Sequence, residues 1–112
     1  MAGADPVESL GTLGRYAGSA TLILSSLAGG PKHGYALTQD IEEFAGVRVA
    51  PGTLYEALTR LERLGLIEAV ESGDRRRPYR LTASGATALH AHLDVQRRVA
   101  DVGLRRLAGD PG

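Results

Sequence analysis

The sequence predicts a mainly α-helical fold that contains one small β-hairpin. Apolar residues recur every three or four positions through most of the chain, and one later stretch alternates apolar and polar residues around a Gly-Asp turn. Only 4% of the 112 residues are aromatic although 43% are hydrophobic, so the core must be built from Leu, Val, Ile and Ala. A chain this small buries only about 60–68% of its unfolded surface, so it would gain stability from a partner subunit.

Residues 1–18 form an N-terminal arm in this prediction, because glycines and a proline interrupt the segment. A short helix around residues 7–13 would need a partner to stay ordered. Ser19 then offers an N-cap to the first long helix, which ends at the stop signal GGP at residues 29–31.

Two amphipathic helices follow, over residues 34–44 and 51–64. Each carries polar or charged side chains away from its apolar face and has a glycine just beyond its end, Gly46 and Gly65. The second helix opens with a proline, which the first turn tolerates because its missing N–H would be unpaired there. The apolar residues are Leu37, Ile41 and Phe44 in the first helix and Leu54, Leu58, Leu61 and Leu64 in the second.

The apolar spacing then changes to that of β-strands. Short runs over residues 66–71 and 78–82 alternate apolar and polar side chains, and Gly73 and Asp74 between them favour a turn. This predicts a hairpin with a basic tip. Two helices, a short connection between them and a hairpin together describe a winged helix-turn-helix domain over residues 19–82.

A long C-terminal helix is predicted over residues 83–108, with Thr82 as its N-cap and residues 109–112 as a disordered tail. It carries two apolar strips, whereas one would suffice for packing on its own domain. We therefore expect this helix to form a homodimer, although a helix wrapped by its own N-terminal arm is an alternative. The candidate dimerisation residues are Leu89, Leu93, Gln96, Ala100 and Leu107, beside a second strip of Ala88, Val95, Val99 and Val102.

The helix over residues 51–64 carries the candidate recognition chemistry. In a helix-turn-helix this helix enters the major groove of DNA with its N-terminal half towards the bases. Hydrogen-bonding groups such as Thr59 and Arg60 lie off the leucine face and could contact a ligand there. The alternative is a solvated face that holds ion pairs such as Glu56 with Arg60.

The run of Arg75, Arg76 and Arg77 is the most concentrated positive charge in the chain. On a turn it could reach phosphates or a minor groove, whereas charge runs are often only solvated loops. We favour DNA contact because Asp74 is the only acid within the tip and a hairpin has no packing use for three guanidinium groups.

Three motifs resemble the PadR family of winged-helix transcriptional regulators: HGYAL from residue 33, PGTLY from residue 51 and RPYRLT from residue 77. The resemblance spans residues 22–93. It implies a homodimer that binds double-stranded DNA at a pseudo-palindromic operator, usually as a repressor, with the C-terminal helix as the dimer contact. Carried over by position, Tyr35, Thr53 and Tyr55 are expected to face DNA, and the three wing arginines are expected to contact phosphates.

Two positions depart from the family pattern. Ala50 stands where the family commonly has a serine, and Glu56 replaces a common proline and adds negative charge near DNA. Thr53 and Glu56 have capping-box spacing, which would fold the Glu56 carboxylate back onto backbone N–H groups. The family also includes ligand-responsive members, and here a pocket for a small hydrophobic effector would be aliphatic, built from Leu89, Leu93, Val95 or Val99.

Several other classes are disfavoured. Without cysteine the chain has no disulfide, thiol nucleophile or Cys-ligated zinc, and His90 and His92 would point about 200° apart on a helix and could not share a metal. We therefore expect no catalytic site, no cofactor and no enzymatic activity. The longest apolar run is far short of the roughly 18 residues that a membrane span needs, so we expect a cytoplasmic protein without a membrane segment or signal peptide.

The net charge of zero conceals a polarised chain. Residues 1–47 hold two basic and five acidic side chains, residues 48–82 seven and five, and residues 83–112 four and three, which gives −3, +2 and +1. Neutrality and Glu56 support an alternative function, a winged-helix protein–protein interaction module that does not bind DNA. For the DNA-binding hypothesis, the same charge distribution predicts modest non-specific affinity.

Overall fold

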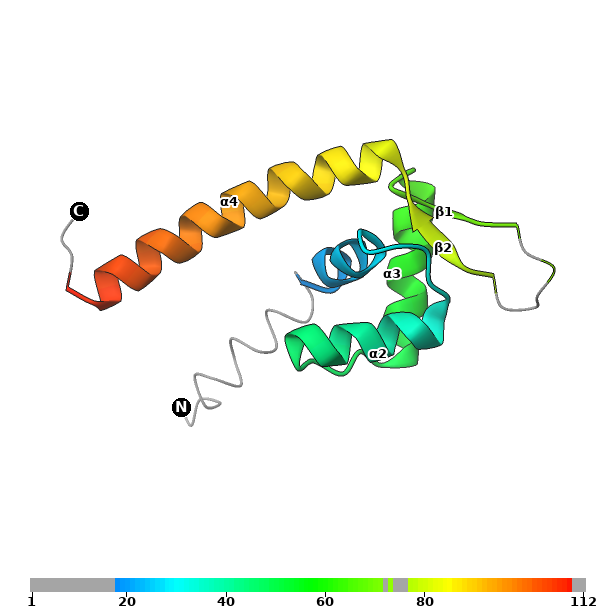
Figure 1. Cartoon of the computed structure of the whole chain (residues 1–112), viewed down its shortest axis with the longest axis horizontal. Helices are drawn as coiled ribbons and strands as arrows, with labels where there is room; N and C mark the ends of the chain where they lie inside the picture. The colour runs from blue at the N-terminus through cyan, green and yellow to red at the C-terminus, as the bar shows by residue number, and fades with distance from the viewer. Residues whose placement is uncertain (1–17, 72, 74–76, 110–112) are drawn as a thin grey trace, which may run out of the picture.

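The computed structural model describes residues 18–71, 73 and 77–109 (Figure 1). Their order is a helix over residues 18–27, then α2 (Gly34–Ala45), α3 (Pro51–Arg63), β1 (Ile67–Ala69), β2 (Tyr79–Leu81) and α4 (Ala83–Leu107). The prediction of a mainly helical fold with one small hairpin is confirmed. The expected helix at residues 7–13, the wing residues Arg75 and Arg76, and tail residues 110–112 lie outside the described residues.

One apolar core joins all the helices to the sheet. The 18–27 helix contributes Ile23, Leu24 and Leu27, and since Gly18 is already helical, Ser19 lies inside this helix rather than capping it. The other elements add the remaining buried apolar residues: Leu37, Ile41, Val49, Leu54, Leu58, Leu61, Ile67 and Leu89.

α2 ends where its sequence predicts. Gly46 adopts a left-handed conformation (φ 67°), and its N–H donates to the Glu42 carbonyl at 2.9 Å. Leu37 and Ile41 are fully buried, but Phe44 is 52% exposed. The spacing placed Phe44 on the same face, yet it lies in the last turn, just before the chain leaves the helix.

The start of α3 differs from the prediction. Its N-cap is Ala50, which has no side chain able to cap, and Pro51 occupies the first turn. Thr53 therefore lies inside the helix, and the predicted capping box with Glu56 is wrong. At the other end the helix stops at Arg63, so Leu64 follows it as the C-cap and is 64% exposed.

The hairpin is shorter than predicted, and a third segment of the chain pairs with it. β1 and β2 pair antiparallel, with Ile67 opposite Leu81 and Glu68 opposite Arg80. Lys32, in the segment before α2, then pairs with Tyr79 through two backbone hydrogen bonds of 3.0 and 2.8 Å. This third segment fixes the wing to the start of α2, although nothing in its sequence resembles a strand.

The first turn of α4 is held against the start of β1. Thr82 caps α4 as predicted by accepting a 3.0 Å hydrogen bond from the Gly85 N–H. The Thr82 hydroxyl donates to the Gly65 carbonyl at 2.7 Å, and the Thr82 N–H donates to the Leu66 carbonyl at 3.1 Å. A Cβ atom at Gly85 would overlap the Leu66 carbonyl oxygen, so only glycine fits. These four residues form what we call the α4 clasp.

Beyond the clasp, α4 extends away from the core as a long arm (Figure 1). Leu89 is only 6% exposed and belongs to the core of its own chain. Beyond Leu89, Val102 is partly buried, whereas five large apolar side chains are exposed: Leu93 (38%), Val95 (48%), Val99 (66%), Leu104 (66%) and Leu107 (87%). Within the described residues, no helix combines the length and the apolar character needed to cross a membrane.

Candidate nucleic-acid interface

α3 divides into a buried face and an exposed face. Leu54, Leu58 and Leu61 are at most 3% exposed and fix the helix on the core. The predicted contact residues Thr53, Tyr55, Thr59 and Arg60 are all exposed. Because the leucines prevent rotation about the helix axis, these polar groups stay turned towards solvent.

Two hydroxyl groups of this surface already take part in hydrogen bonds within the protein. Thr59 Oγ1 donates to the Tyr55 carbonyl at 2.9 Å, so its oxygen can only accept from a further partner. Such a group suits the amino group of a base rather than a phosphate oxygen. The Tyr35 hydroxyl instead accepts from Gln39 Nε2 at 3.1 Å, which leaves its own proton free for a phosphate.

The two predicted tyrosines come from different helices of the motif. Tyr35 is 66% exposed in the first turn of α2, and Tyr55 is 59% exposed on α3. A Cβ atom at Gly34 would lie 3.3 Å from the Tyr55 hydroxyl oxygen. The glycine of the HGYAL motif therefore leaves room for Tyr55 to lie against the start of α2.

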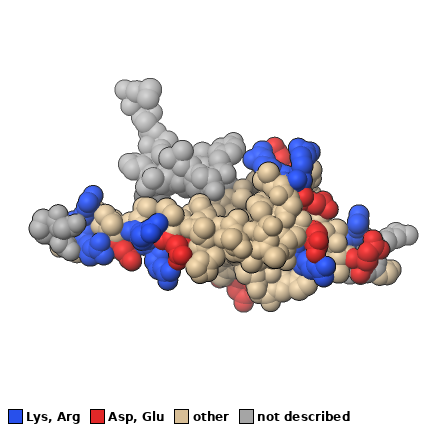
Figure 2. Space-filling view, turned by 90° about the horizontal axis from the view of Figure 1, so that it is seen from above, with Lys and Arg blue, Asp and Glu red and all other residues tan. Residues whose placement is uncertain are grey.

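The arginines near this surface differ in whether an acidic side chain pairs with them. Within the described part of the chain, Arg60 and Arg63 make no ion pair, so the ion-paired alternative with Glu56 is not what the structure shows. Arg80 is neutralised, since its Nε lies 2.6 Å from Glu68 Oε1 across the hairpin. Arg77 is exposed. Figure 2 views the molecule from the side of α4, and that face shows basic side chains beside acidic ones rather than a broad area of one sign.

A cleft of about 860 Å³ lies between α2, the connection to α3 and the 18–27 helix. It brings Tyr35 and Thr53 to one site together with Arg48, whose Nη2 lies 3.5 Å from Glu42 Oε1. Arg48 and Gln39 were not among the residues predicted from the sequence. The signal was that Arg48 is the one basic residue between α2 and α3.

The candidate dimer residues occupy the arm of α4. Leu93, Gln96, Ala100 and Leu107 are exposed in the single chain, as a surface for a partner requires. Leu89 differs because its side chain is already buried in its own core. Over the described residues, no cluster of three or more His, Cys, Asp or Glu side chains could hold a metal ion.

A helix-turn-helix fixed on a leucine core, followed by a short hairpin, defines a winged helix-turn-helix protein. The family model described as "Transcriptional regulator PadR-like family" matches residues 23–91. The chain therefore belongs to the PadR-like family of transcriptional regulators.

Individual relatives match parts of the chain. The chain is 46% identical over 70 residues to the transcriptional regulator Rv3488 of Mycobacterium tuberculosis. The aligned region covers 60% of this chain and 64% of that protein. It is 42% identical over 79 residues to a 37.1 kDa protein in transposon TN4556 of Streptomyces fradiae. This aligned region covers 70% of this chain and 23% of that protein. The match thus spans less than two thirds of either relative.

Solved structures show the same fold over more of the chain. The crystal structure of a PadR family transcriptional regulator from Eggerthella lenta matches with a TM-score of 0.71 and 31% identity. That match covers 92% of this chain and 92% of the other. It therefore includes elements outside the region matched by the family model.

Proposed function

We propose that the protein regulates transcription as a homodimer that binds double-stranded DNA, acting as a repressor at a pseudo-palindromic operator. The observation that carries the proposal is the two-sided α3. Three buried leucines hold it on the core, while Thr53, Tyr55, Thr59 and Arg60 remain exposed and hydrogen-bond competent. A helix presented in this way suits the major groove, whose base edges carry a donor and acceptor pattern.

In this proposal each protomer contributes one half of the DNA contact. α3 lies in the major groove, and the wing arginines Arg75, Arg76 and Arg77 bind the neighbouring backbone. The arms of α4 pair two protomers, so two half-sites lie about one helical turn apart, roughly 34–36 Å. Residues 19–82 then form the DNA-binding domain and residues 83–108 the dimerisation helix.

The same arrangement supports release by a small hydrophobic effector. Leu93 lies on one apolar strip of α4 and Val95 and Val99 lie on the other, and all three side chains are exposed. Where two arms meet, such side chains would enclose an aliphatic pocket at the dimer contact. A bound effector would change the spacing of the two recognition helices and so lower operator affinity.

Replacing both Arg75 and Arg76 by alanine tests the DNA contact. If each binds one phosphate, the slope of log affinity against log salt falls by about two units, and affinity drops on every sequence alike. The measurement is a gel-shift titration between about 50 and 200 mM salt. Arg97→Ala combined with Arg98→Ala on α4 is the matched control and should leave the slope unchanged.

Wild-type protein that shows no duplex binding across this salt range would overturn the proposal. It would favour the alternative of a protein–protein interaction module. Duplex binding with an unchanged slope in the wing variant would remove only the role assigned to Arg75 and Arg76.

A further inference from the structure

Arg48 lies in the connection between α2 and α3, and its side chain points to solvent. Gly46 ends α2 in the left-handed region, and the chain then runs to the extended Ala50 at the start of α3. Val49 is 9% exposed and anchored in the core. Since side chains alternate along an extended segment, anchoring Val49 inward turns the preceding Arg48 outward, where its side chain is 84% exposed.

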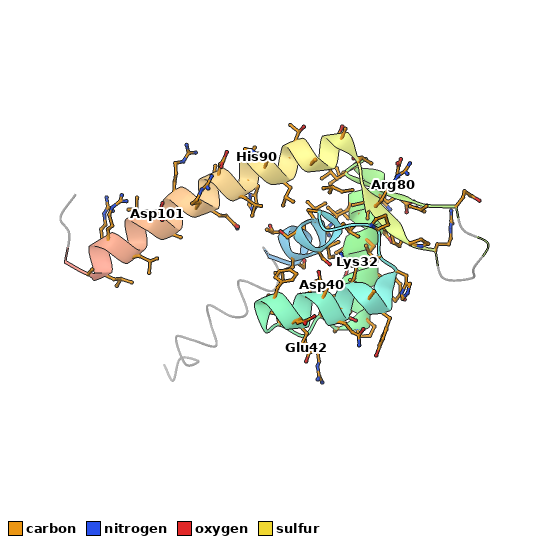
Figure 3. The ribbon with its side chains drawn as sticks, viewed as in Figure 1. Lys32, Asp40, Glu42, Arg80, His90 and Asp101 are labelled. Atoms are coloured by element: carbon orange, nitrogen blue, oxygen red, sulfur yellow. The ribbon has the colours of Figure 1, made fainter. Side chains whose placement is uncertain are left out.

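The cleft around Arg48 is lined from both helices of the motif. α2 supplies Tyr35 and Glu42, the connection supplies Arg48, and α3 supplies Thr53. Figure 3 labels two acids of α2: Asp40 lies beside Lys32, whereas Glu42 lies apart from them on the lower side of α2 in this view. Asp40 is occupied by a 2.6 Å hydrogen bond from the Ser26 hydroxyl. Glu42 is therefore the acid that faces Arg48.

The pair of Arg48 with Glu42 is weak and replaceable. Its closest atoms are 3.5 Å apart, and the Glu42 side chain is 53% exposed. Exposed pairs of this kind add little stability because water and salt screen them. A phosphate is a stronger partner for a guanidinium, since it can accept two parallel charge-assisted hydrogen bonds.

We propose that this cleft seats a backbone phosphate of duplex DNA on Arg48, and that Glu42 lowers DNA affinity by holding Arg48 in the free protein. The proposal rests on the DNA-binding function proposed above and adds a residue to it. The Tyr35 hydroxyl, whose oxygen accepts from Gln39, and the Thr53 hydroxyl lie in the same cleft as further donors. Glu42 acts twice, because it occupies the guanidinium and repels the incoming phosphate.

The experiment uses a random-sequence duplex of about two helical turns, because non-specific binding reports phosphate contacts alone. The proteins are the wild type, Glu42→Gln, Arg48→Ala and the double variant. Glu43→Gln is the matched control, since Glu43 is also exposed and adjacent in sequence but does not line the cleft. All five are compared at several salt concentrations, and circular dichroism checks that they are equally folded.

Glu42→Gln should bind the duplex about fivefold more tightly than the wild type, and its salt slope should steepen by up to about one unit. Arg48→Ala should bind more weakly with a shallower slope. In the Arg48→Ala background, Glu42→Gln should gain clearly less than it gains in the wild type, because only the repulsion of the phosphate is then removed. This non-additivity separates release of Arg48 from a simple change in net charge.

Equal effects of Glu42→Gln and Glu43→Gln, or an undiminished effect of Glu42→Gln without Arg48, would overturn the inference. In either case salt-dependent binding by the wild type would leave the proposed DNA-binding function standing. Absence of duplex binding by all five proteins would overturn both.

Discussion

Gly85→Ala is expected to lower the free energy of unfolding by at least about 2 kcal/mol, because overpacking of a closed contact is costly. The new Cβ would overlap the Leu66 carbonyl oxygen and lie 2.8 Å from Leu81 Cδ1. To relieve this, α4 must move away from β1, which weakens both hydrogen bonds that Thr82 makes to residues 65 and 66. The loss should appear in urea denaturation at a fixed protein concentration.

Gly52→Ala is the control with the opposite sign. Gly52 lies in α3, where an added Cβ meets nothing within 4 Å. Alanine favours a helix over glycine by up to about 1 kcal/mol, so this variant should be slightly stabilised. If both variants gained stability, α4 would not be clasped to β1 as the structure shows.

Leu107→Asp is expected to raise the dissociation constant of the proposed homodimer by at least about 100-fold, since burial of a leucine contributes about 1.5–3 kcal/mol and two copies change at once. Leu107 is 87% exposed in the single chain, so the fold of each protomer should survive. Sedimentation equilibrium measures the change. Operator affinity should fall in parallel, because each half-site would then be bound separately.

Thr87→Asp provides the matched control for this prediction. It adds the same charge to an exposed position of α4 that lies outside both apolar strips, about 160° around the helix from Leu107. Its dimerisation should change little. A Leu107→Asp protein that still dimerises like the wild type would contradict the role assigned to the arm.

Much of the fold could be predicted because its signals are local. Gly46 and Gly65 end their helices with positive φ angles, and the Thr82 hydroxyl caps α4. These features depend on a few neighbouring residues and on the absence of a Cβ atom. The long-range pairing of Lys32 with Tyr79 could not be predicted, because 47 positions separate the two residues. The pairing is also made by backbone hydrogen bonds, which do not depend on the pattern of apolar and polar side chains.

The errors in the helices also have physical causes. Phe44 and Leu64 continue the apolar spacing but lie where their helices end, so the spacing alone overestimated their burial. The capping box failed because Pro51 opens the helix three residues earlier than the spacing of Thr53 and Glu56 requires.

The candidate site was predictable residue by residue but not as an arrangement. The polar face of α3 follows from the spacing of its leucines, and Tyr35 came from resemblance to a family motif. The cleft that joins Tyr35, Thr53 and Arg48 depends on how the connection after Gly46 runs beside α2. That path is set by the burial of Val49, a tertiary contact that periodicity does not encode.

Selection from a random DNA library with the purified protein tests whether the proposed dimer binds DNA through two symmetric recognition helices. We expect recovery of an inverted repeat whose half-sites are centred about 10–10.5 base pairs apart, the spacing of two recognition helices related by a two-fold axis. Failure to enrich any sequence, or enrichment of a single half-site by a protein that remains dimeric, would contradict it.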